Sequence, residues 1–277
     1  MDEQELPRRR FSKQAVRFRQ VCKEFPSRPK PVMGLHGFSC DIEEGEFAVI
    51  LGPSGCGKST AIRIAAGLET PTSGSVLVNG KPVRGPVREC GMVFQAYTSF
   101  PWLSVLDNIA FGLRYSTHLN RQERKERARE FAAKVGLEQF EDSSIQTLSG
   151  GMRQRVAIAC ALVTNPAILF MDEPFGALDS QTRLLMQEHL LTIVEQSNNT
   201  VIFVTHDIEE ALLLGDRIYI CSSRPAHVLA EFDVPFPHPR SHLTRDRRDF
   251  FEMKSQIFHL LREDSYARRL EETYERR

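Results

Sequence analysis

The chain has 277 residues, of which 41% are hydrophobic and 26% charged, and its formal net charge at pH 7 is zero. This composition predicts one large or two small folded domains and excludes bulk electrostatic attraction to nucleic acid or to an anionic membrane. The apolar runs fall far short of the roughly 18 residues that a membrane-spanning helix needs, and the acidic start predicts no signal peptide. The six cysteines form no close pair, which favours a reducing cytosol over a disulfide framework or a zinc site.

The N-terminal part of the sequence predicts a tail followed by strands. Residues 1–14 are polar, so we expect a flexible tail, whose basic triplet at 8–10 is either solvated or touches lipid headgroups. Residues 15–50 alternate apolar and polar, which indicates antiparallel strands. The run 76–78 ends in an Asn-Gly pair at 79–80, which predicts a β-hairpin.

The segment 52–60 fits the phosphate-binding pattern G-x-x-x-x-G-K-[ST] at every fixed position. It lies between an apolar run at 47–51 and an apolar-faced helix at 61–66, the strand and helix that this loop requires. Its backbone N–H groups and the helix N-terminus attract an anion. We expect Lys58 to reach the β- and γ-phosphates of ATP and Ser59 to ligate Mg²⁺. The predicted ATP-binding residues of this loop are Gly52, Pro53, Ser54, Gly55, Cys56, Gly57, Lys58, Ser59 and Thr60.

Later segments alternate between helical and strand patterns. Helices are predicted at 121–135, 150–163 and 184–195, and buried strands at 167–171 and 200–205. Bare apolar strands of this kind fit a central parallel sheet, so the expected fold class is α/β with a mostly parallel sheet core.

Two carboxylates and a histidine follow predicted buried strands. Asp172 at the end of its strand is expected to hold Mg²⁺, and Glu173 to polarise a water for attack on the γ-phosphate. An apolar run that ends in Asp-Glu is a weak signal alone, but beside a phosphate loop it indicates the second half of an ATPase site. His206 follows the strand 200–205, where it either has a structural role or, as we favour, contacts the γ-phosphate.

A second predicted anion site starts the helix after Ser149. Ser149 is a suitable N-cap, and the glycines that follow it allow close approach of an anion. Since one phosphate loop is already present, the economical arrangement is a head-to-tail dimer, in which this segment covers the nucleotide of the other copy. The run Leu-Ser-Gly-Gly-Met-Arg-Gln at 148–154 resembles the signature loop of ATP-binding cassette (ABC) proteins. The resemblance adds Ser149, Gly150, Gly151 and Gln154 to the expected ATP-binding residues.

The resemblance covers about residues 15–225 and implies further roles. Gln95 matches the glutamine that contacts Mg²⁺ and the attacking water, and Asp179 lies in the loop that crosses the dimer interface. Phe25 occupies the place of an aromatic that stacks on adenine, although by composition alone a phenylalanine is more often in the core. Cys160 stands where such proteins commonly carry arginine, which puts a supporting contact of that helix in doubt.

The segments 100–113, 223–226 and 234–240 look like the nitrate, sulfonate and taurine importer group. Membership implies a P-loop NTPase with an N-terminal antiparallel β-subdomain and a helical signature subdomain at about 97–160. It also implies ATP and Mg²⁺ as cofactors, and a peripheral place on the cytoplasmic face of the inner membrane. Expected partners are a second copy, a membrane permease and, indirectly, a periplasmic or lipid-anchored binding protein, with no nucleic acid. The alternatives are another organic-solute importer or a non-transport ABC ATPase.

Two groups of apolar residues each allow two interpretations. The aromatic residues Tyr97, Phe100 and Trp102 follow closely after Gln95 and either contact the permease or pack the helical subdomain. In the expected extension at 226–277, apolar residues have the spacing of an amphipathic helix that serves either regulation and an interface or simple packing. These apolar residues are Phe250, Phe251, Ile257, Leu260 and Leu261.

Overall fold

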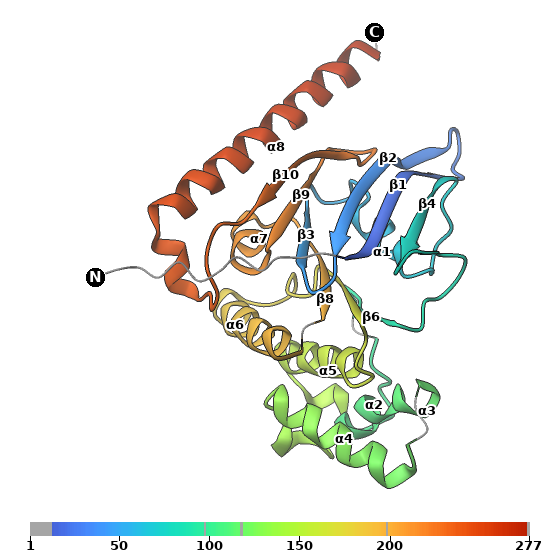
Figure 1. The fold of residues 1–277 in the computed structure, drawn as a ribbon, viewed down its shortest axis with the longest axis vertical. Coiled ribbons are helices and arrows are strands. Elements are labelled where there is room, and N and C mark those ends of the chain that lie inside the picture. Colours follow the sequence, from blue (N-terminus) through green and yellow to red (C-terminus); the bar gives the residue numbers. More distant parts are fainter. Residues whose placement is uncertain (1–12, 97, 117–118, 198, 276–277) are drawn as a thin grey trace. The chain divides into compact units, whose positions relative to one another are not determined.

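The computed structural model describes residues 13–96, 98–116, 119–197 and 199–275 (Figure 1). The chain divides into two compact units: Met1–Pro86 with Val204–Arg277, here called the first unit, and Val87–Phe203, the second unit. Most of the expected tail, with its basic triplet, lies outside the described residues, and so does Tyr97. Within the described ranges, no helix has the length and apolar character needed to cross a bilayer.

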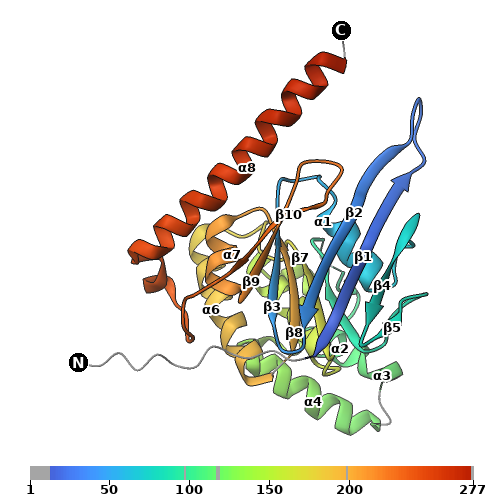
Figure 2. The ribbon, with the colours of Figure 1, turned by 45° about the horizontal axis from the view of Figure 1, so that its top comes forward.

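The N-terminal part of the first unit is a four-stranded sheet in the order β2-β1-β4-β5 (Figure 2). The pairs β1–β2, β1–β4 and β4–β5 are antiparallel, which confirms the predicted antiparallel strands. The rings of Phe18 and Phe38 pack edge to face inside this sheet, with their centroids 5.2 Å apart. The strands are β1 (Gln14–Phe25), β2 (Val32–Glu43), β4 (Ser73–Val78) and β5 (Lys81–Pro82). Because β1 begins at Gln14, the last residue of the expected 1–14 tail already belongs to the sheet.

The predicted hairpin joins β4 to β5. Asn79 and Gly80 have φ angles of 48° and 75°. Positive φ at both central residues is the requirement of the type I′ turn, whose twist matches that of paired strands. The Asn-Gly pair therefore forms the turn that the sequence predicts.

A second sheet in the first unit is built on β3 (Phe47–Leu51), in which every residue is buried. β3 runs parallel to β9 (Arg217–Cys221), and β9 pairs antiparallel with β10 (Val228–Asp233). The helices α1 (Lys58–Ala65) and α7 (Ile208–Leu214) belong to the same unit. Because β10 is a strand of this sheet, the expected extension at 226–277 begins inside the sheet and not after it.

The C-terminal segment is tied to the first unit by a buried arginine and an aromatic pair. Arg240 is 5% exposed and donates to the carbonyl of Phe236 at 3.0 Å and to the carbonyl of Leu213, in the last turn of α7, at 3.4 Å. The segment continues through η3 (His242–Asp246) into α8 (Arg248–Glu275) (Figure 1). The Phe250 ring of α8 packs on Phe236, with centroids 5.5 Å apart.

The expected apolar face of α8 holds only in part. Phe250 and Ile257 are buried, but Phe251 is 62% exposed and Leu260 and Leu261 are half-buried. Phe251 cannot share a face with Phe250, because successive helical residues are about 100° apart. Phe251 is therefore wrongly placed in the predicted packing set.

The second unit holds β6 (Cys90–Val93), which runs parallel to β7 (Ile168–Asp172), and the first residues of β8 (Thr200–Thr205). Helix α4 (Arg121–Lys134) begins with a complete capping box, in which Asn120 and Glu123 satisfy each other's backbone N–H groups. Its start at Arg121 matches the predicted position. The other helical elements are α2 (Val105–Phe111), α3 (Leu113–Ser116), η1 (Glu138–Phe140), η2 (Ile145–Thr147), α5 (Gly150–Leu162) and α6 (Ser180–Ser197).

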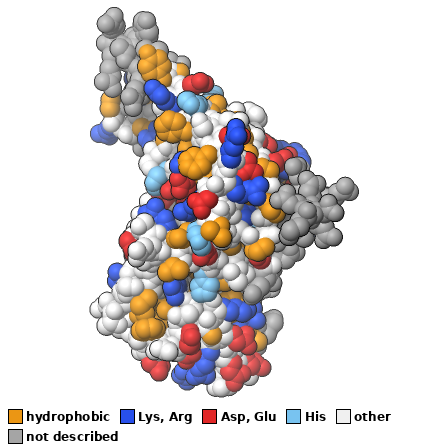
Figure 3. All heavy atoms as spheres, turned by 90° about the vertical axis from the view of Figure 1, so that its left-hand side faces the viewer, with side chains coloured by type: hydrophobic (Ala, Val, Ile, Leu, Met, Phe, Trp, Pro, Cys, Tyr) orange, Lys and Arg blue, Asp and Glu red, His pale blue; other side chains and the backbone are white. Residues whose placement is uncertain are grey.

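On the molecular face of Figure 3, acidic and basic side chains are interspersed and do not gather into a patch of one sign. This agrees with the formal net charge of zero. The basic stripe that typically marks a nucleic-acid-binding surface is not visible on that face.

Candidate nucleotide-binding site

The phosphate loop joins β3 to α1 and depends on glycine at two positions. Gly55 and Gly57 have φ angles of 75° and 133°, which side chains rarely allow. A Cβ atom on Gly57 would also lie 2.4 Å from the carbonyl oxygen of Gly34 in β2. The loop can therefore pack this closely against β2 only because residue 57 has no side chain.

The loop holds its lysine at its own backbone. Lys58 is 3% exposed, and its ammonium donates to the carbonyl oxygens of Gly52 and Pro53, at 2.8 Å each. Gly57 is the N-cap residue of α1 and makes no side-chain hydrogen bond. A lysine ammonium beside a helix N-terminus is an arrangement suited to phosphate.

Cys56 lies in the same loop and is 1% exposed. Desolvation by burial raises the pKa of its thiol, against the smaller opposing effect of Lys58. The thiol therefore stays protonated near neutral pH and acts as a small buried residue of the loop.

The end of β8 lies beside the start of the loop. The N–H of Gly52 donates to the carbonyl of Thr205 at 3.3 Å, and His206, which is exposed, follows directly. The Thr205 hydroxyl bonds the buried Glu210 carboxylate and accepts from the N–H of Asp207 at 3.0 Å. Asp207 in turn caps α7. The turn that carries His206 is thus fixed by hydrogen bonds on both sides.

Phe25 lies at the end of β1, paired with Val32, and is half-buried. The Lys23 ammonium lies 5.2 Å from the centroid of its ring. A Cβ atom on Gly34 would lie 2.9 Å from the same ring. Gly34 also packs against Gly57. The ring of Phe25 is therefore separated from the phosphate loop by Gly34 alone.

In the second unit, Gln95 and Glu173 lie at the same edge of the sheet. β6 and β7 run parallel, and Val93 pairs with Met171. Gln95 and Glu173 each follow this pair by two residues, at the carboxyl ends of the two strands. Asp172 ends β7 and is fully buried, whereas Gln95 is exposed and Glu173 half-buried. Glu173 has a φ angle of +43°, a conformation that non-glycine residues rarely adopt and that is concentrated at functional sites.

The predicted signature segment starts α5. Ser149 is its N-cap and accepts a hydrogen bond from the N–H of Met152 at 3.3 Å, as predicted. Gly151 permits close packing on α6, since a Cβ atom there would lie 2.7 Å from Cγ2 of Thr182. Gln154, one turn after Gly151, shares this inner face and is 2% exposed. The expectation that Gln154 contacts a partner's nucleotide stays a prediction.

Asp179 is exposed before the start of α6, where its carboxylate accepts from the N–H of Thr182 at 3.0 Å. This backbone hydrogen bond is the main cause of a lowered pKa for Asp179. The structure thus gives Asp179 a helix-capping role, in addition to the interface role that the sequence suggests.

The expected magnesium donors have suitable chemistry. They are the Ser59 hydroxyl, the Asp172 carboxylate and the Gln95 amide, all oxygen donors of the kind that Mg²⁺ prefers. In the described part of the chain, three or more His, Cys, Asp or Glu residues do not gather anywhere as a possible metal site.

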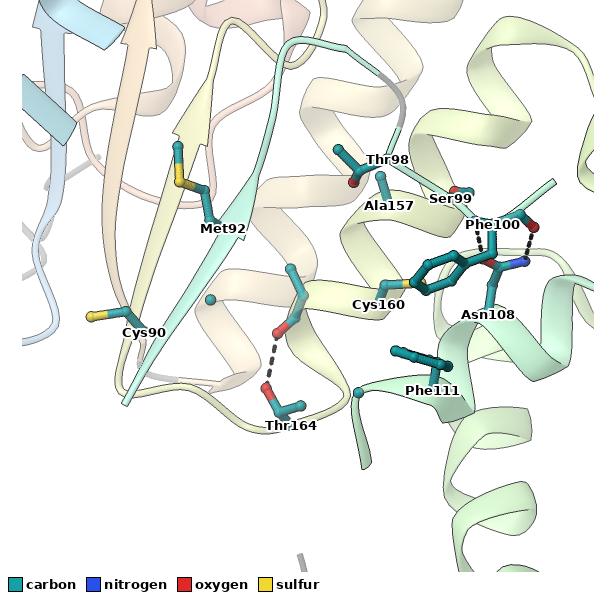
Figure 4. Close-up of a pocket in the computed structure, with 13 residues that line it drawn as sticks. Cys90, Met92, Thr98, Ser99, Phe100, Asn108, Phe111, Ala157, Cys160 and Thr164 are labelled. Atoms are coloured by element: carbon teal, nitrogen blue, oxygen red, sulfur yellow. Dashed lines mark hydrogen bonds between the residues drawn. The ribbon is translucent and has the colours of Figure 1, made fainter. Parts of the chain in front are cut away.

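A pocket of about 290 Å³ lies in the second unit, beside α2, α5 and the segment at 98–100 (Figure 4). Phe100 is fixed there by buried Asn108, whose amide accepts from the N–H of Phe100 at 2.7 Å and donates to its carbonyl at 3.1 Å. Phe111 and Cys160 also line the pocket, and Trp102, whose ring centroid lies 5.4 Å from that of Phe100, is 76% exposed. From the sequence, Cys160 stood out only because such proteins commonly carry arginine there. The residues that line the pocket are far apart in the sequence, so no local pattern predicts it.

Arg224 is a neighbour of the phosphate loop that sequence reasoning missed. Its guanidinium donates to the carbonyl of Gly55 at 2.9 and 2.7 Å. The two residues are 169 positions apart, so no local pattern could have joined them.

Comparisons with known proteins identify the family of the chain. The family model described as ABC transporter matches residues 35–176. An uncharacterized ABC transporter ATP-binding protein of Methanocaldococcus jannaschii is 42% identical over 260 residues, 94% of this chain and 96% of that protein. The nitrate import ATP-binding protein NrtD of Synechocystis is 42% identical over 248 residues, 87% of this chain and 91% of that protein. Relatives named for the import of aliphatic sulfonates and of taurine match at 40% and 48% identity.

Among solved structures, the ATP-binding cassette MJ0796, in a dimeric post-hydrolysis state bound to ADP and Pi, matches with a TM-score of 0.71. It is 34% identical, and the match covers 79% of this chain and 98% of that chain. The likeness confirms the predicted P-loop NTPase fold class.

Proposed function

The chain belongs to the ABC transporter family, and from that premise we propose that it is the ATP-hydrolysing subunit of an importer for a small anion such as nitrate, a sulfonate or taurine. The observation that carries the proposal is the phosphate loop, with Lys58 buried against it and His206 beside its start. The names of the nitrate, sulfonate and taurine import relatives support the solute class.

We assign the chemistry to five side chains. Lys58 neutralises the β- and γ-phosphates, and His206 contacts the γ-phosphate. Glu173 accepts a proton from the attacking water, and Gln95 orients that water from the same edge of the sheet. Phe25 stacks on the adenine. The positive φ of Glu173 supports its assignment, since it turns the residue after β7 out of the regular strand path.

We propose that Ser59, Asp172 and Gln95 would hold a magnesium ion, since all three carry oxygen donors. When bound, Mg²⁺ neutralises charge on the phosphate oxygens. Asp172 ends β7 beside Glu173, and its carboxylate is an oxygen donor of the kind that Mg²⁺ prefers, which supports its role as a ligand.

We further propose that two copies clamp two ATP molecules head to tail. The start of α5, at Ser149 and Gly150, would bind the phosphates of the partner's nucleotide through its N-terminal N–H groups. The dimeric state of the MJ0796 cassette supports this arrangement. We keep Gly151 and Gln154, which follow in the same segment, in the proposed contact.

The pocket beside Phe100 is our proposed docking site for the permease. An exposed tryptophan beside a pocket is typical of a surface that anchors a partner. Docking there places the chain at the cytoplasmic face of the inner membrane as a peripheral subunit. A periplasmic or lipid-anchored binding protein then acts only indirectly, through the permease.

The proposal is tested by phosphate release from Mg-ATP, with Lys58→Ala as the inactive control. Uptake of labelled nitrate, sulfonate or taurine should be lost when the gene is deleted and restored by the wild type but not by Lys58→Ala. An ATPase whose deletion leaves uptake of all three solutes unchanged would exclude the proposed solute class. A wild-type protein that does not hydrolyse ATP, alone or with its permease, would exclude the function itself.

A further inference from the structure

An arginine from a distant part of the first unit holds the middle of the phosphate loop. Two N–H groups of Arg224 donate to the single carbonyl oxygen of Gly55. Charge-assisted hydrogen bonds of this kind are stronger than those between neutral groups. The carbonyl of Gly55 is therefore fixed toward Arg224.

Fixing this carbonyl also fixes an N–H group of the loop. Because the peptide unit is planar and trans, the carbonyl of Gly55 and the N–H of Cys56 point in opposite directions. That N–H donates to the carbonyl of Pro53 at 3.3 Å. The 55–56 peptide is thus held on both sides, in the segment whose N–H groups must face the phosphates.

The backbone that carries Arg224 is itself anchored on β2. Ala226 forms an isolated parallel bridge with Leu35, donating to the carbonyl of Gly34 at 3.0 Å and accepting from the N–H of His36 at 3.1 Å. Ala226 is fully buried. Gly34 is the residue that packs against Gly57, so this anchor and the phosphate loop share one support.

The long helix α8 reaches the same segment. The Asp264 carboxylate accepts from both the N–H and the hydroxyl of Ser223, at 2.7 Å each. Ser223 immediately precedes Arg224, so the carboxylate fixes the backbone from which the arginine extends. Asp264 lies 41 residues from Ser223.

From these contacts we propose that Arg224 is a positioning residue for the phosphate loop and that α8 supports it through Asp264. The inference rests on the proposed ATP-binding function and deepens it. It gives the C-terminal helix a task at the nucleotide site, besides the packing of Phe250. The chain Asp264–Ser223–Arg224–Gly55 preorganises the loop, which lowers the cost of ordering it around ATP.

The test compares four variants of the full chain: Arg224→Gln, Arg224→Lys, Asp264→Asn and, as control, Glu263→Gln, an exposed carboxylate next to Asp264. We expect Arg224→Gln to raise the Kd for ATP roughly three- to tenfold, because charged hydrogen bonds to an exposed side chain are lost. Arg224→Lys keeps the charge but not the paired N–H groups, so its Kd for ATP should lie between those of the wild type and of Arg224→Gln. Asp264→Asn should raise the Kd about two- to threefold, and Glu263→Gln should not change it.

The rate constant separates positioning from a merely structural role. In this account kcat at saturating ATP stays within about twofold of wild type, since loop preorganisation acts on binding, and the melting temperature without nucleotide is unchanged. Wild-type Kd values for both Arg224→Gln and Asp264→Asn would overturn the inference. So would a raised Kd matched by a lowered melting temperature in both variants. Failure of the wild type to bind ATP would instead overturn the proposed function.

Discussion

Gly57 occupies a position that a residue with a side chain could take only if β2 moved, and this makes a sharp prediction. Gly57→Ala should abolish ATP binding and destabilise the fold by more than the roughly 1–3 kcal/mol that backbone strain alone costs. The matched control is Gly80→Ala, which has φ of 75° but no atom within 4 Å of the added Cβ. Denaturant unfolding and ATP titration of the two variants should separate the effect of backbone strain from that of the contact with Gly34. Equal losses of stability and of ATP affinity in both variants would contradict the close packing.

The sequence predicted the motif residues of the site but not all the residues that contact them. The fixed positions of the phosphate loop and the N-cap Ser149 could be predicted because each depends on a few consecutive residues. The burial of Gln154 could not be predicted, because it depends on which face of α5 packs on its neighbours. Arg224 was missed because its partner Gly55 is distant in the sequence.

Helix α8 shows what element-level prediction can and cannot give. Its helical character follows from the spacing of its apolar residues, but which of two adjacent phenylalanines faces inward depends on where the helix docks. We predict that Phe250→Ala lowers the free energy of unfolding by about 3–5 kcal/mol, the usual cost of removing a buried phenylalanine. The neighbouring Phe251→Ala should cost less than about 0.5 kcal/mol, since this ring is exposed. Chemical denaturation checks both, and similar losses would show that α8 does not dock through Phe250.

The strands, too, could be predicted from the sequence only in part. Strands β3 and β8 match the predicted ranges, because uninterrupted apolar runs flanked by turns are strong signals. β10 was not predicted, because its sequence Val-Leu-Ala-Glu-Phe-Asp lacks a strict apolar–polar alternation and lies between two segments that were assigned by resemblance alone. It pairs antiparallel with β9, the strand directly before it in the sequence.

At the scale of the whole molecule, the proposed permease contact has a built-in reporter. Trp102 is the only tryptophan of the chain and is 76% exposed. Binding of the permease in detergent should shift its fluorescence emission to shorter wavelength and reduce quenching by iodide, because the ring leaves water. Cys160→Arg would place a long cationic side chain in the same pocket and should weaken the shift. An unchanged spectrum and unchanged quenching on permease binding would remove Trp102 from the contact.

The central claim is that this chain is an ATPase in which Glu173 activates water while other residues hold the nucleotide. Glu173→Gln keeps the size of the side chain but removes its basicity. The most direct measurement is the ATPase rate of this variant, followed together with ATP-dependent dimerisation by size-exclusion chromatography. We predict a rate about 100- to 10,000-fold below wild type, with ATP binding retained and a persistent ATP-bound dimer, because a negative charge near the γ-phosphate is also removed. Hydrolysis by Glu173→Gln at close to the wild-type rate would contradict the account.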